Sequence, residues 1–581
     1  MTGGSMRVLR VGVTFASILL VAAQGFGQKL VSFAKLTSSQ SGAAGANAVV
    51  SADVNGDFFP DIVVATNNGV SVILNNGDGT LAPSVTYATG GTLSESLAVV
   101  DVNVDGSPDI VVTNMCNNSS GCFGVAVLIG NGDGTFQSAV GYDPGGLETG
   151  AVAAGDVDGD GTPDLVLVNN CQPQTCVAGT QALLLNNGDG TFGSPKALTD
   201  AKGPVALGDM NNDGIMDLVT GAGVMLGNGD GTFQPANSEV VGGASSITLA
   251  DLNNDGILDV VSTLPTRVAA QLGDGTGALL AANSYATGGA NPLAVTVADF
   301  NGDNFGELAV INECTKLMNG GCTGAPSVGV LASNGDGTFK AAVIFGTGGA
   351  FGTSVSVGDM DQDGKLDLVA STACVTGSNC NEGTVVALRN NFIAKTTINL
   401  MSSLNPAILN DTVIFTATIT SPIPVPDGSQ VTFFDKGVPV DTESTVGGVA
   451  TFTTSFTVKG NHAIKATYDG DLYHSASVKA LTETVNLYPS TTMLVSAPNP
   501  SSQFQTVALT ATVSSNAPGG PTGMVTFDNS GTVLGKATLN HGVATLYYFG
   551  LPVGTLTINA TYKGDTQSAL STGSTTQTVH P

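Results

Sequence analysis

The chain has 581 residues, a formal net charge of −28 and only 11% charged residues, with 78 Gly, four His and no Trp. This length predicts three or four domains, and the acidic character excludes electrostatic binding to nucleic acid or anionic membranes while favouring cations. Gly is abundant without a Gly-X-Y period, which excludes a collagen-like fibre and indicates many tight turns between short strands.

The first 27 residues are predicted to be a signal peptide. Arg7 and Arg10 form a basic start, an apolar run extends from Val11 to Ala23, and small residues follow it. The run is too short to span a bilayer comfortably, and no other stretch suits a membrane helix. We therefore expect an exported mature chain that is secreted, periplasmic or at the cell surface, with no membrane insertion. The alternative is that the run is a buried core segment.

A repeated acidic motif dominates residues 28–392. In each repeat a strand of small apolar residues precedes the motif, a β-branched strand follows it, and a third strand ends in a turn such as Asn131-Gly-Asp-Gly-Thr-Phe136. A fourth strand is expected to start at that Phe, because Asn-Gly and Asp-Gly pairs favour hairpin turns. The motif, Asp-x-Asn/Asp-x-Asp-Gly-x-x-Asp, begins at Asp53, Asp101, Asp156, Asp209, Asp251, Asp299 and Asp359.

Four strands per repeat predict an all-β fold in which residues 28–392 form a seven-bladed β-propeller. The seventh repeat lacks its fourth strand, and residues 30–36 form a spare strand before the first repeat. We expect this segment to pair into the last blade and close the ring, which leaves no free edge. The alternative is an open stack of repeats, but the sequence shows no caps for such a stack.

The acidic motif predicts calcium sites. Places one, three, five and nine carry carboxylates or amides, and oxygen ligands in a flexible turn suit Ca2+, so we expect up to seven ions. Site one is the least regular, because Phe58 stands where Gly is usual, and site six has Asn304 there. For any single loop the alternative is an Asx-rich turn without metal.

The predicted ligands occupy the same four places in every repeat. They are Asp53, Asn55, Asp57 and Asp61; Asp101, Asn103, Asp105 and Asp109; Asp156, Asp158, Asp160 and Asp164; Asp209, Asn211, Asp213 and Asp217; Asp251, Asn253, Asp255 and Asp259; Asp299, Asn301, Asp303 and Glu307; Asp359, Asp361, Asp363 and Asp367. Without metal, like charges within a loop are expected to push some of these carboxylates toward protonation.

All eight Cys residues lie in the predicted propeller, as four close pairs that each occupy one loop. An exported protein meets an oxidising compartment, so four local disulfides are expected. Zinc binding is the alternative, but this region contains no His and lacks Cys-x2-Cys spacing. The expected pairs are Cys116 with Cys122, Cys171 with Cys176, Cys314 with Cys322, and Cys374 with Cys380.

The acidic loop and the Gly-Asp-Gly turn recur together and in order, and this combination resembles the FG-GAP and VCBS repeat family of the integrin α-chain propellers. The resemblance covers about residues 28–391. It implies calcium at Asp101, Asn103, Asp105 and Asp109 and at the equivalent places of the other repeats. It also implies ligand binding on the face opposite the acidic loops, where the Cys loops are expected to lie. We therefore expect an extracellular protein or glycan partner at this rim.

Residues 393–487 and 488–581 are predicted to form two Ig-like β-sandwiches. The segment Ala466-Thr-Tyr-Asp-Gly-Asp471 aligns with Ala560-Thr-Tyr-Lys-Gly-Asp565, and strands alternate with turns every 8–12 residues. These segments resemble bacterial Ig-like repeats, which serve as spacers in surface proteins. The tripeptide Lys563-Gly564-Asp565 looks like an adhesion motif, but its counterpart Asp469-Gly470-Asp471 indicates a turn common to both domains.

The predicted function is non-catalytic recognition of a glycan or protein partner. All four His residues lie in the C-terminal third, which excludes a Ser-His-Asp or zinc-water site in the propeller. The alternative is a calcium-dependent polysaccharide lyase, for which Arg267, Lys316 and Arg389 are the candidate cationic residues. A carboxylate-pair glycosidase is possible in principle, but the metal loops claim most carboxylates.

Overall fold

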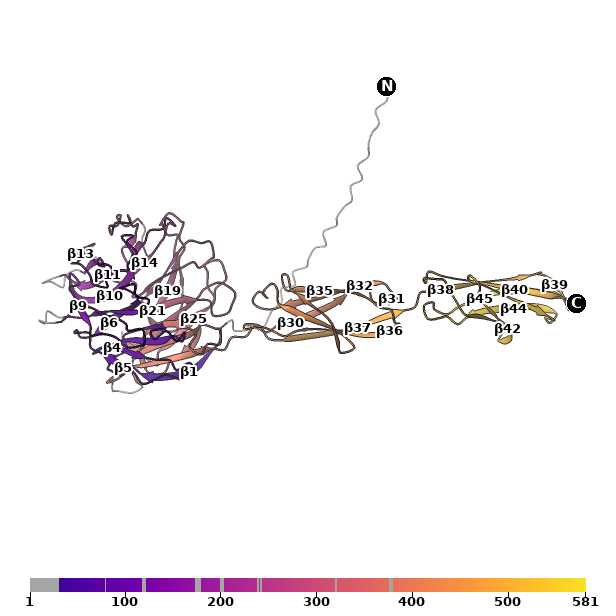
Figure 1. Cartoon of the computed structure of the whole chain (residues 1–581), viewed down its shortest axis with the longest axis horizontal. Helices are drawn as coiled ribbons and strands as arrows, with labels where there is room; N and C mark the ends of the chain where they lie inside the picture. Colours follow the sequence, from indigo (N-terminus) through magenta and orange to yellow (C-terminus); the bar gives the residue numbers. More distant parts are fainter. Residues whose placement is uncertain are drawn as a thin grey trace, which may run out of the picture.

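The computed structural model describes residues 31–78, 80–116, 122–172, 179–198, 203–237, 240, 243–318, 321–375 and 380–581. The predicted signal peptide lies outside these residues. All regular structure in the described part is β-strand, which confirms the all-β class, and no helix there is long and apolar enough to cross a membrane. Figure 1 shows a round N-terminal unit followed by two elongated sandwiches in one line.

The N-terminal unit is built from small antiparallel sheets, each next to one acidic motif. The first three contain β2 (Ala48–Ala52), β3 (Asp61–Thr66), β4 (Gly69–Ile73) and β5 (Val85–Tyr87); β6 (Ser94–Val100), β7 (Asp109–Asn114), β8 (Val125–Leu128) and β9 (Val140–Tyr142); β10 (Leu147–Gly155), β11 (Asp164–Cys171), β12 (Thr180–Leu184) and β13 (Lys196–Ala197). The next two contain β14 (Val205–Gly208), β15 (Asp217–Thr220) and β16 (Gly223–Met225); β17 (Ile247–Ala250), β18 (Asp259–Leu264), β19 (Arg267–Gln271) and β20 (Asn283–Tyr285).

The last two sheets complete the N-terminal unit. They contain β21 (Ala290–Ala298), β22 (Glu307–Cys314), β25 (Ser327–Leu331) and β26 (Val343–Gly346); β27 (Ala350–Gly358), β28 (Asp367–Cys374), β29 (Thr384–Asn390) and β1 (Phe33–Gln40). A small hairpin of β23 (Lys316–Met318) and β24 (Gly321–Thr323) separates β22 from β25. The second strand of each sheet is β-branched and almost wholly buried, as expected of a strand covered on both faces.

The sheets are arranged as the blades of a propeller. The first strand of each sheet contacts the first strand of the next, from β2 through β6, β10, β14, β17 and β21 to β27, and β27 contacts β2 again. The N-terminal strand β1 pairs antiparallel with β29, with Ser38 opposite Val386. This pairing confirms that the N-terminal strand closes the ring, although the strand spans residues 33–40 instead of 30–36. The open stack is therefore wrong.

Two local details differ from the expected four-strand blade. In the described residues the fourth blade has three strands, and beyond them Asn237 N–H donates to Val224 O at 2.9 Å. The fourth strands also begin later than expected. Phe136 forms an isolated bridge with Gly130, and β9 starts four residues further on.

Aromatic pairs join neighbouring blades. A Tyr on the fourth strand of one blade meets the Phe after the Gly-Asp-Gly turn of the next blade, edge to face, with ring centroids 5.4 to 5.6 Å apart. This geometry is favourable for aromatic rings and adds to the apolar area that they bury. The pairs are Tyr87 with Phe136, Tyr142 with Phe192, and Tyr285 with Phe339.

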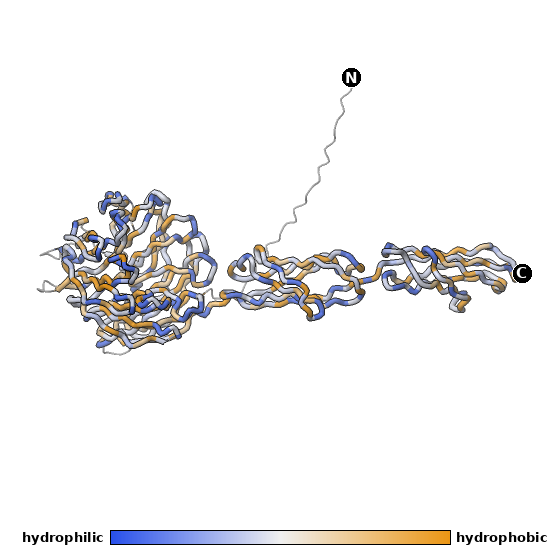
Figure 2. The backbone as a smooth tube through the Cα atoms, in the orientation of Figure 1, coloured by the Kyte–Doolittle hydropathy of each residue, from blue (hydrophilic) through white to orange (hydrophobic). Residues whose placement is uncertain are grey.

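The two C-terminal units share one sandwich topology of a three-stranded and a five-stranded sheet. Along their strands apolar and polar residues alternate (Figure 2), which buries one face of each sheet. The first contains β30 (Thr397–Ser402), β32 (Thr412–Thr420) and β35 (Val449–Ser455) against β31 (Ala407–Ile408), β37 (Ser477–Asn486), β36 (Gly460–Tyr468), β33 (Gln430–Asp435) and β34 (Val438–Ser444). The second contains β38 (Ser490–Ala497), β40 (Thr506–Ser515) and β43 (Val543–Phe549) against β39 (Ser501–Ser502), β45 (Ser571–His580), β44 (Gly554–Tyr562), β41 (Met524–Asn529) and β42 (Thr532–Thr538).

Candidate functional site

The acidic loops lie between the first and second strands of each blade, and all of them share one backbone conformation. Places four and six have positive φ in every repeat, including Phe58 with φ 71° and Asn304 with φ 67°. The backbone of loop one is therefore regular despite its Phe, whose side chain is 85% exposed. The other residues with positive φ at these places are Gly56, Val104, Gly106, Gly159, Gly161, Asn212, Gly214, Asn254, Gly256, Gly302, Gln362 and Gly364.

Backbone N–H groups orient the carboxylates at places one and five. In loop two, the Asp101 carboxylate accepts hydrogen bonds from Asp105 N–H at 3.1 Å and Gly106 N–H at 2.8 Å, and Asp105 Oδ1 accepts one from Ser107 N–H at 2.8 Å. Asn103 Oδ1 also accepts from Asp105 N–H, at 3.2 Å. The side-chain oxygens therefore converge on the loop interior, as expected of an Asx-rich turn that can hold a cation.

The place-nine carboxylate has a structural role that the sequence did not reveal. In loop two, Asp109 is fully buried, and it accepts Val102 N–H at 2.9 Å and Gly130 N–H at 2.7 Å, which joins the loop to the end of the third strand. The same two bonds recur in every blade. The other acceptors are Asp61, Asp164, Asp217, Asp259, Glu307 and Asp367.

Burial raises the pKa of these place-nine carboxyls. Desolvation is the largest cause, backbone hydrogen bonds oppose it, and the negative charges at places one to five add a smaller increase. The pKa reaches about 6 for Asp61 and Asp259, about 7 for Asp367 and about 8 for Glu307. From the sequence, repulsion between like charges was expected to raise the pKa of these carboxyls, but their burial raises it more. A bound cation would favour the ionised form of all of these groups.

The donor set at places one, three and nine differs between loops. Within the described residues, three carboxylates with oxygens within 4.8 Å of one another occur at Asp156, Asp158 and Asp164 and at Asp359, Asp361 and Asp367. Where place three is Asn, its Nδ2 donates to the place-five carboxylate at 2.8 to 2.9 Å in loops one, two, four and five. In these four loops an amide N–H therefore contacts the place-five carboxylate.

Two buried oxygens in loops six and seven suit a cation. Asn301 Oδ1 is completely buried and Asp361 Oδ1 is largely so, and neither has a hydrogen-bond partner among the described residues. An unpartnered buried oxygen is costly, and a divalent cation would satisfy it. The residues present therefore fit Ca2+, and the ligands predicted from the sequence remain predictions.

Loop seven already contains a positive charge of its own. Arg389, at the end of β29, places Nε 2.7 Å from Asp361 Oδ2, and its Nη2 donates to Asp363 Oδ2 at 3.0 Å. Lys365, at place seven, is buried and donates from Nζ to Phe392 O at 3.0 Å. Arg389 thus partly neutralises the carboxylates of this loop, whereas Lys365 is bound to a backbone carbonyl.

The acidic loops are linked to one another around the propeller. Place-four side chains donate to the place-six carbonyl of the following loop: Asn212 to Gly256 O at 2.9 Å, Asn254 to Asn304 O at 2.8 Å, and Gln362 to Phe58 O at 3.0 Å. The last bond crosses from the seventh repeat to the first, where the ring closes. The loop conformation of one blade therefore affects the contacts of the next.

The Cys loops lie on the opposite face. The second strand of a blade starts at the acidic loop and ends at the Cys loop, because β7 runs from Asp109 to Asn114 and Cys116 follows. Disulfides join Cys116 to Cys122, Cys314 to Cys322 and Cys374 to Cys380, as predicted. The fourth predicted pair, Cys171 with Cys176, cannot be described because Cys176 lies outside the described residues.

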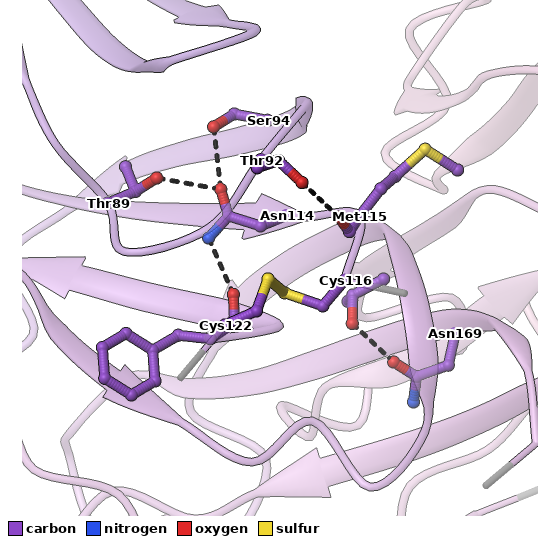
Figure 3. The surroundings of a disulfide bond; sticks show 10 residues. Thr89, Thr92, Ser94, Asn114, Met115, Cys116, Cys122 and Asn169 are labelled. Carbon is purple, nitrogen blue, oxygen red and sulfur yellow. Dashed lines mark hydrogen bonds between the residues drawn. A yellow bond between two sulfur atoms is a disulfide. The ribbon is translucent and has the colours of Figure 1, made fainter. Parts of the chain in front are cut away.

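Buried Asn residues anchor these loops. Asn114 accepts hydrogen bonds from Thr89 Oγ1 at 3.0 Å and Ser94 Oγ at 2.8 Å, and its Nδ2 donates to Phe123 O at 2.9 Å (Figure 3). Asn169 and Asn312 make equivalent bonds in blades three and six. The recurrence of Asn at the end of these second strands was the sequence signal for this role.

The three cationic residues of the lyase alternative lie in three different blades. Arg389 is paired with the acidic loop of blade seven, whereas Arg267 starts β19 of blade five and Lys316 lies in the β23–β24 hairpin of blade six. The Lys-Gly-Asp tripeptide is also not a free ligand. Asp565 accepts hydrogen bonds from Thr522, Gln567 and Ser568, and it holds the turn together.

Family models match both parts of the chain. The model described as an FG-GAP-like repeat matches residues 53–112, 101–167, 221–262 and 321–370, all within the propeller. The model described as a bacterial Ig-like domain (group 3) matches residues 400–486 and 494–580. The chain carries FG-GAP-like repeats followed by two bacterial Ig-like domains of group 3. No curated protein matches this chain.

Solved structures resemble the chain at low sequence identity. A lectin from Agrocybe aegerita that recognises non-reducing terminal N-acetylglucosamine is 24% identical, with 52% of this chain and 80% of the lectin covered and a TM-score of 0.37. The extracellular domain of a one-component system from B. thetaiotaomicron is 11% identical, with 78% of this chain and 58% of that domain covered and a TM-score of 0.35.

Proposed function

We propose that this FG-GAP protein is an exported, calcium-binding and non-catalytic recognition protein, secreted or held at the cell surface. In this proposal the Cys-loop face of the propeller binds a glycan or protein partner, and the two Ig-like domains act as a spacer. Disulfides and extracellular-type repeats support export. The observation that carries the proposal is the division of the propeller into two faces, one with the acidic loops and the other with loops closed by disulfides.

Calcium in this proposal is structural. The carboxylate and amide oxygens at places one, three, five and nine would hold the ion, which would neutralise the carboxylates, while the backbone N–H groups described above keep these oxygens in position. Because a ligand that binds only the folded state stabilises it, excess chelator should lower the melting temperature of the propeller. Metal analysis of the purified mature chain, together with calorimetry in calcium and in chelator, tests this. An unchanged melting temperature and no bound Ca2+ at millimolar supply would contradict it.

Partner binding can be tested separately from metal binding. Residues 114–124 of blade two should be replaced by a short turn, and the matched control should replace residues 374–380 of blade seven. Melting curves of both proteins check that the fold survives the loss of the buried residues at the ends of each loop. Binding to an immobilised glycan and matrix-protein panel, measured in calcium, should be lost only in the first variant. Turnover of a polyuronide would instead favour the lyase alternative.

A further inference from the structure

A cavity of about 330 Å³ opens on the Cys-loop face between blades two and three. Its wall includes the disulfide between Cys116 and Cys122, the rings of Phe123 and Tyr142, and the carboxylates of Asp143 and Glu148. Its size is at the lower end of the range of about 300 to 1,000 Å³ for small-ligand sites. The cavity therefore has room for one small molecular unit.

The base of this cavity is held by several independent contacts. Asn114 is buried and fixes the Phe123 carbonyl, while its Oδ1 is held by Thr89 and Ser94 (Figure 3). Phe123 N–H donates to Gly90 O at 3.3 Å, and the disulfide joins the two ends of the loop. Because these contacts already fix the cavity wall, the wall loses little conformational entropy when a ligand binds.

The ring of Phe123 is supported by glycine backbone. A Cβ atom at Gly141 would overlap the ring, and a Cβ at Gly90 would also clash with it, so the ring packs directly onto both glycines. Phe123 nevertheless remains 39% exposed and contributes to the cavity wall. The structure thus presents a fixed aromatic surface to the ligand instead of burying it in the core.

The charged side chains that line the cavity among the described residues are carboxylates. Asp143 and Glu148 contribute two carboxylates, and no Lys, Arg or His occurs among the described residues that line the cavity. Such a site accepts hydrogen bonds from hydroxyl groups and repels carboxylates and sulfates, in a propeller that is already strongly acidic. A ligand that fits must combine hydroxyl donors with an apolar surface that can lie on an aromatic ring.

A neutral pyranose has both properties, since one face presents C–H groups and its rim presents hydroxyls. We infer that this cavity binds a neutral sugar residue, with the Phe123 ring as the stacking surface and Asp143 and Glu148 as hydroxyl acceptors. The inference rests on the proposed function and names its ligand class. An apolar side chain of a protein partner is the competing occupant, but it offers no hydroxyl donor to Glu148 or to Asp143, whose Oδ1 already accepts Gly145 N–H at 2.9 Å.

The test uses the full mature chain in calcium on a panel of immobilised neutral oligosaccharides, with polyuronides and sulfated glycans for comparison. At least one neutral glycan should bind and the anionic ones should not. Phe123→Ala should weaken that binding by about tenfold or more, and Glu148→Gln by about threefold. Gly141→Ala should also weaken it, because it displaces the ring without removing it. Melting curves of each variant check that the fold is intact.

Matched controls lie elsewhere on the chain. Phe58→Ala removes an exposed Phe from the opposite face, and Glu382→Gln removes a carboxylate from the blade-seven loop; neither should change binding. If neutral glycans bind but Phe123→Ala binds them equally well, the inference is overturned. It is also overturned if no neutral glycan binds while replacing residues 114–124 abolishes binding to a matrix protein. In both cases the proposed function stands.

Discussion

The ring of Tyr473, in the first Ig-like domain, occupies the space in which a side chain at Gly302 would begin. Gly302 is place four of the sixth acidic loop, so the Ig-like domain rests on that loop. Lys365 of loop seven lies 5.9 Å from the Tyr473 ring centroid, and Tyr473 O accepts Ala394 N–H at 2.7 Å. Phe392 and Ala394 complete a small apolar cluster with Ile423. The propeller and the spacer therefore meet through a packed joint.

The joint should loosen when Gly302 is replaced by Ala. The new methyl group would overlap the Tyr473 ring, and the two domains would have to separate to accommodate it. The matched control is Gly159→Ala, which has the same place and nearly the same φ (77° against 78°) but whose new Cβ would meet no atom closer than 3.8 Å. Proteolysis should cut residues 392–396 faster in Gly302→Ala only, and small-angle scattering should show a broader range of domain orientations. Equal behaviour of the two variants would contradict this account.

We expect the positive charge of Arg389 to supply part of the charge neutralisation that calcium would provide at loop seven. Arg389→Gln removes the charge beside Asp361 and Asp363, which should lower the melting temperature in chelator and enlarge the rise on adding calcium. The guanidinium is 43% exposed, so the loss in chelator should be at most about 1 kcal/mol. Calorimetry with and without calcium measures both effects, with Arg267→Gln as control. An equal loss in both conditions would mean that Arg389 does not compensate for the metal.

Much of the propeller could be predicted because its signals are local and repeated. The acidic loop and the Gly-Asp-Gly turn recur in order, and the missing fourth strand of the last repeat pointed to closure by the N-terminal strand. Contacts between residues distant in sequence could not be read in this way. Pairing of Arg389 with Asp361, docking of Tyr473 on Gly302 and the backbone bonds of Asp109 all depend on how blades and domains pack.

Phe58 should store strain that Gly would relieve. Its φ of 71° places a bulky residue in the left-handed region, which costs about 1 to 2 kcal/mol, and its side chain is too exposed to offset that cost. Phe58→Gly should therefore stabilise the propeller by about 1 kcal/mol after the extra entropy of Gly in the unfolded chain. Asn304→Gly is the control, because Asn tolerates this conformation and the gain should be negligible. Denaturant unfolding in calcium measures both variants, and a destabilised Phe58→Gly would show that the Phe side chain makes a compensating contact.

Asp471 should make the first Ig-like domain sensitive to acid. Burial alone would raise the pKa of this carboxyl, but hydrogen bonds from His474, Tyr468 and the Tyr473 N–H together lower it. A carboxyl with a lowered folded-state pKa stabilises the domain above its unfolded pKa of about 3.9, and this stabilisation is lost as the pH falls through the folded-state value. Asp471→Asn should therefore melt below wild type at neutral pH, and the gap should close below about pH 4. Exposed Asp441→Asn is the control and should follow the wild type throughout. A gap that persists unchanged in acid would show that Asp471 acts through packing and not through its charge.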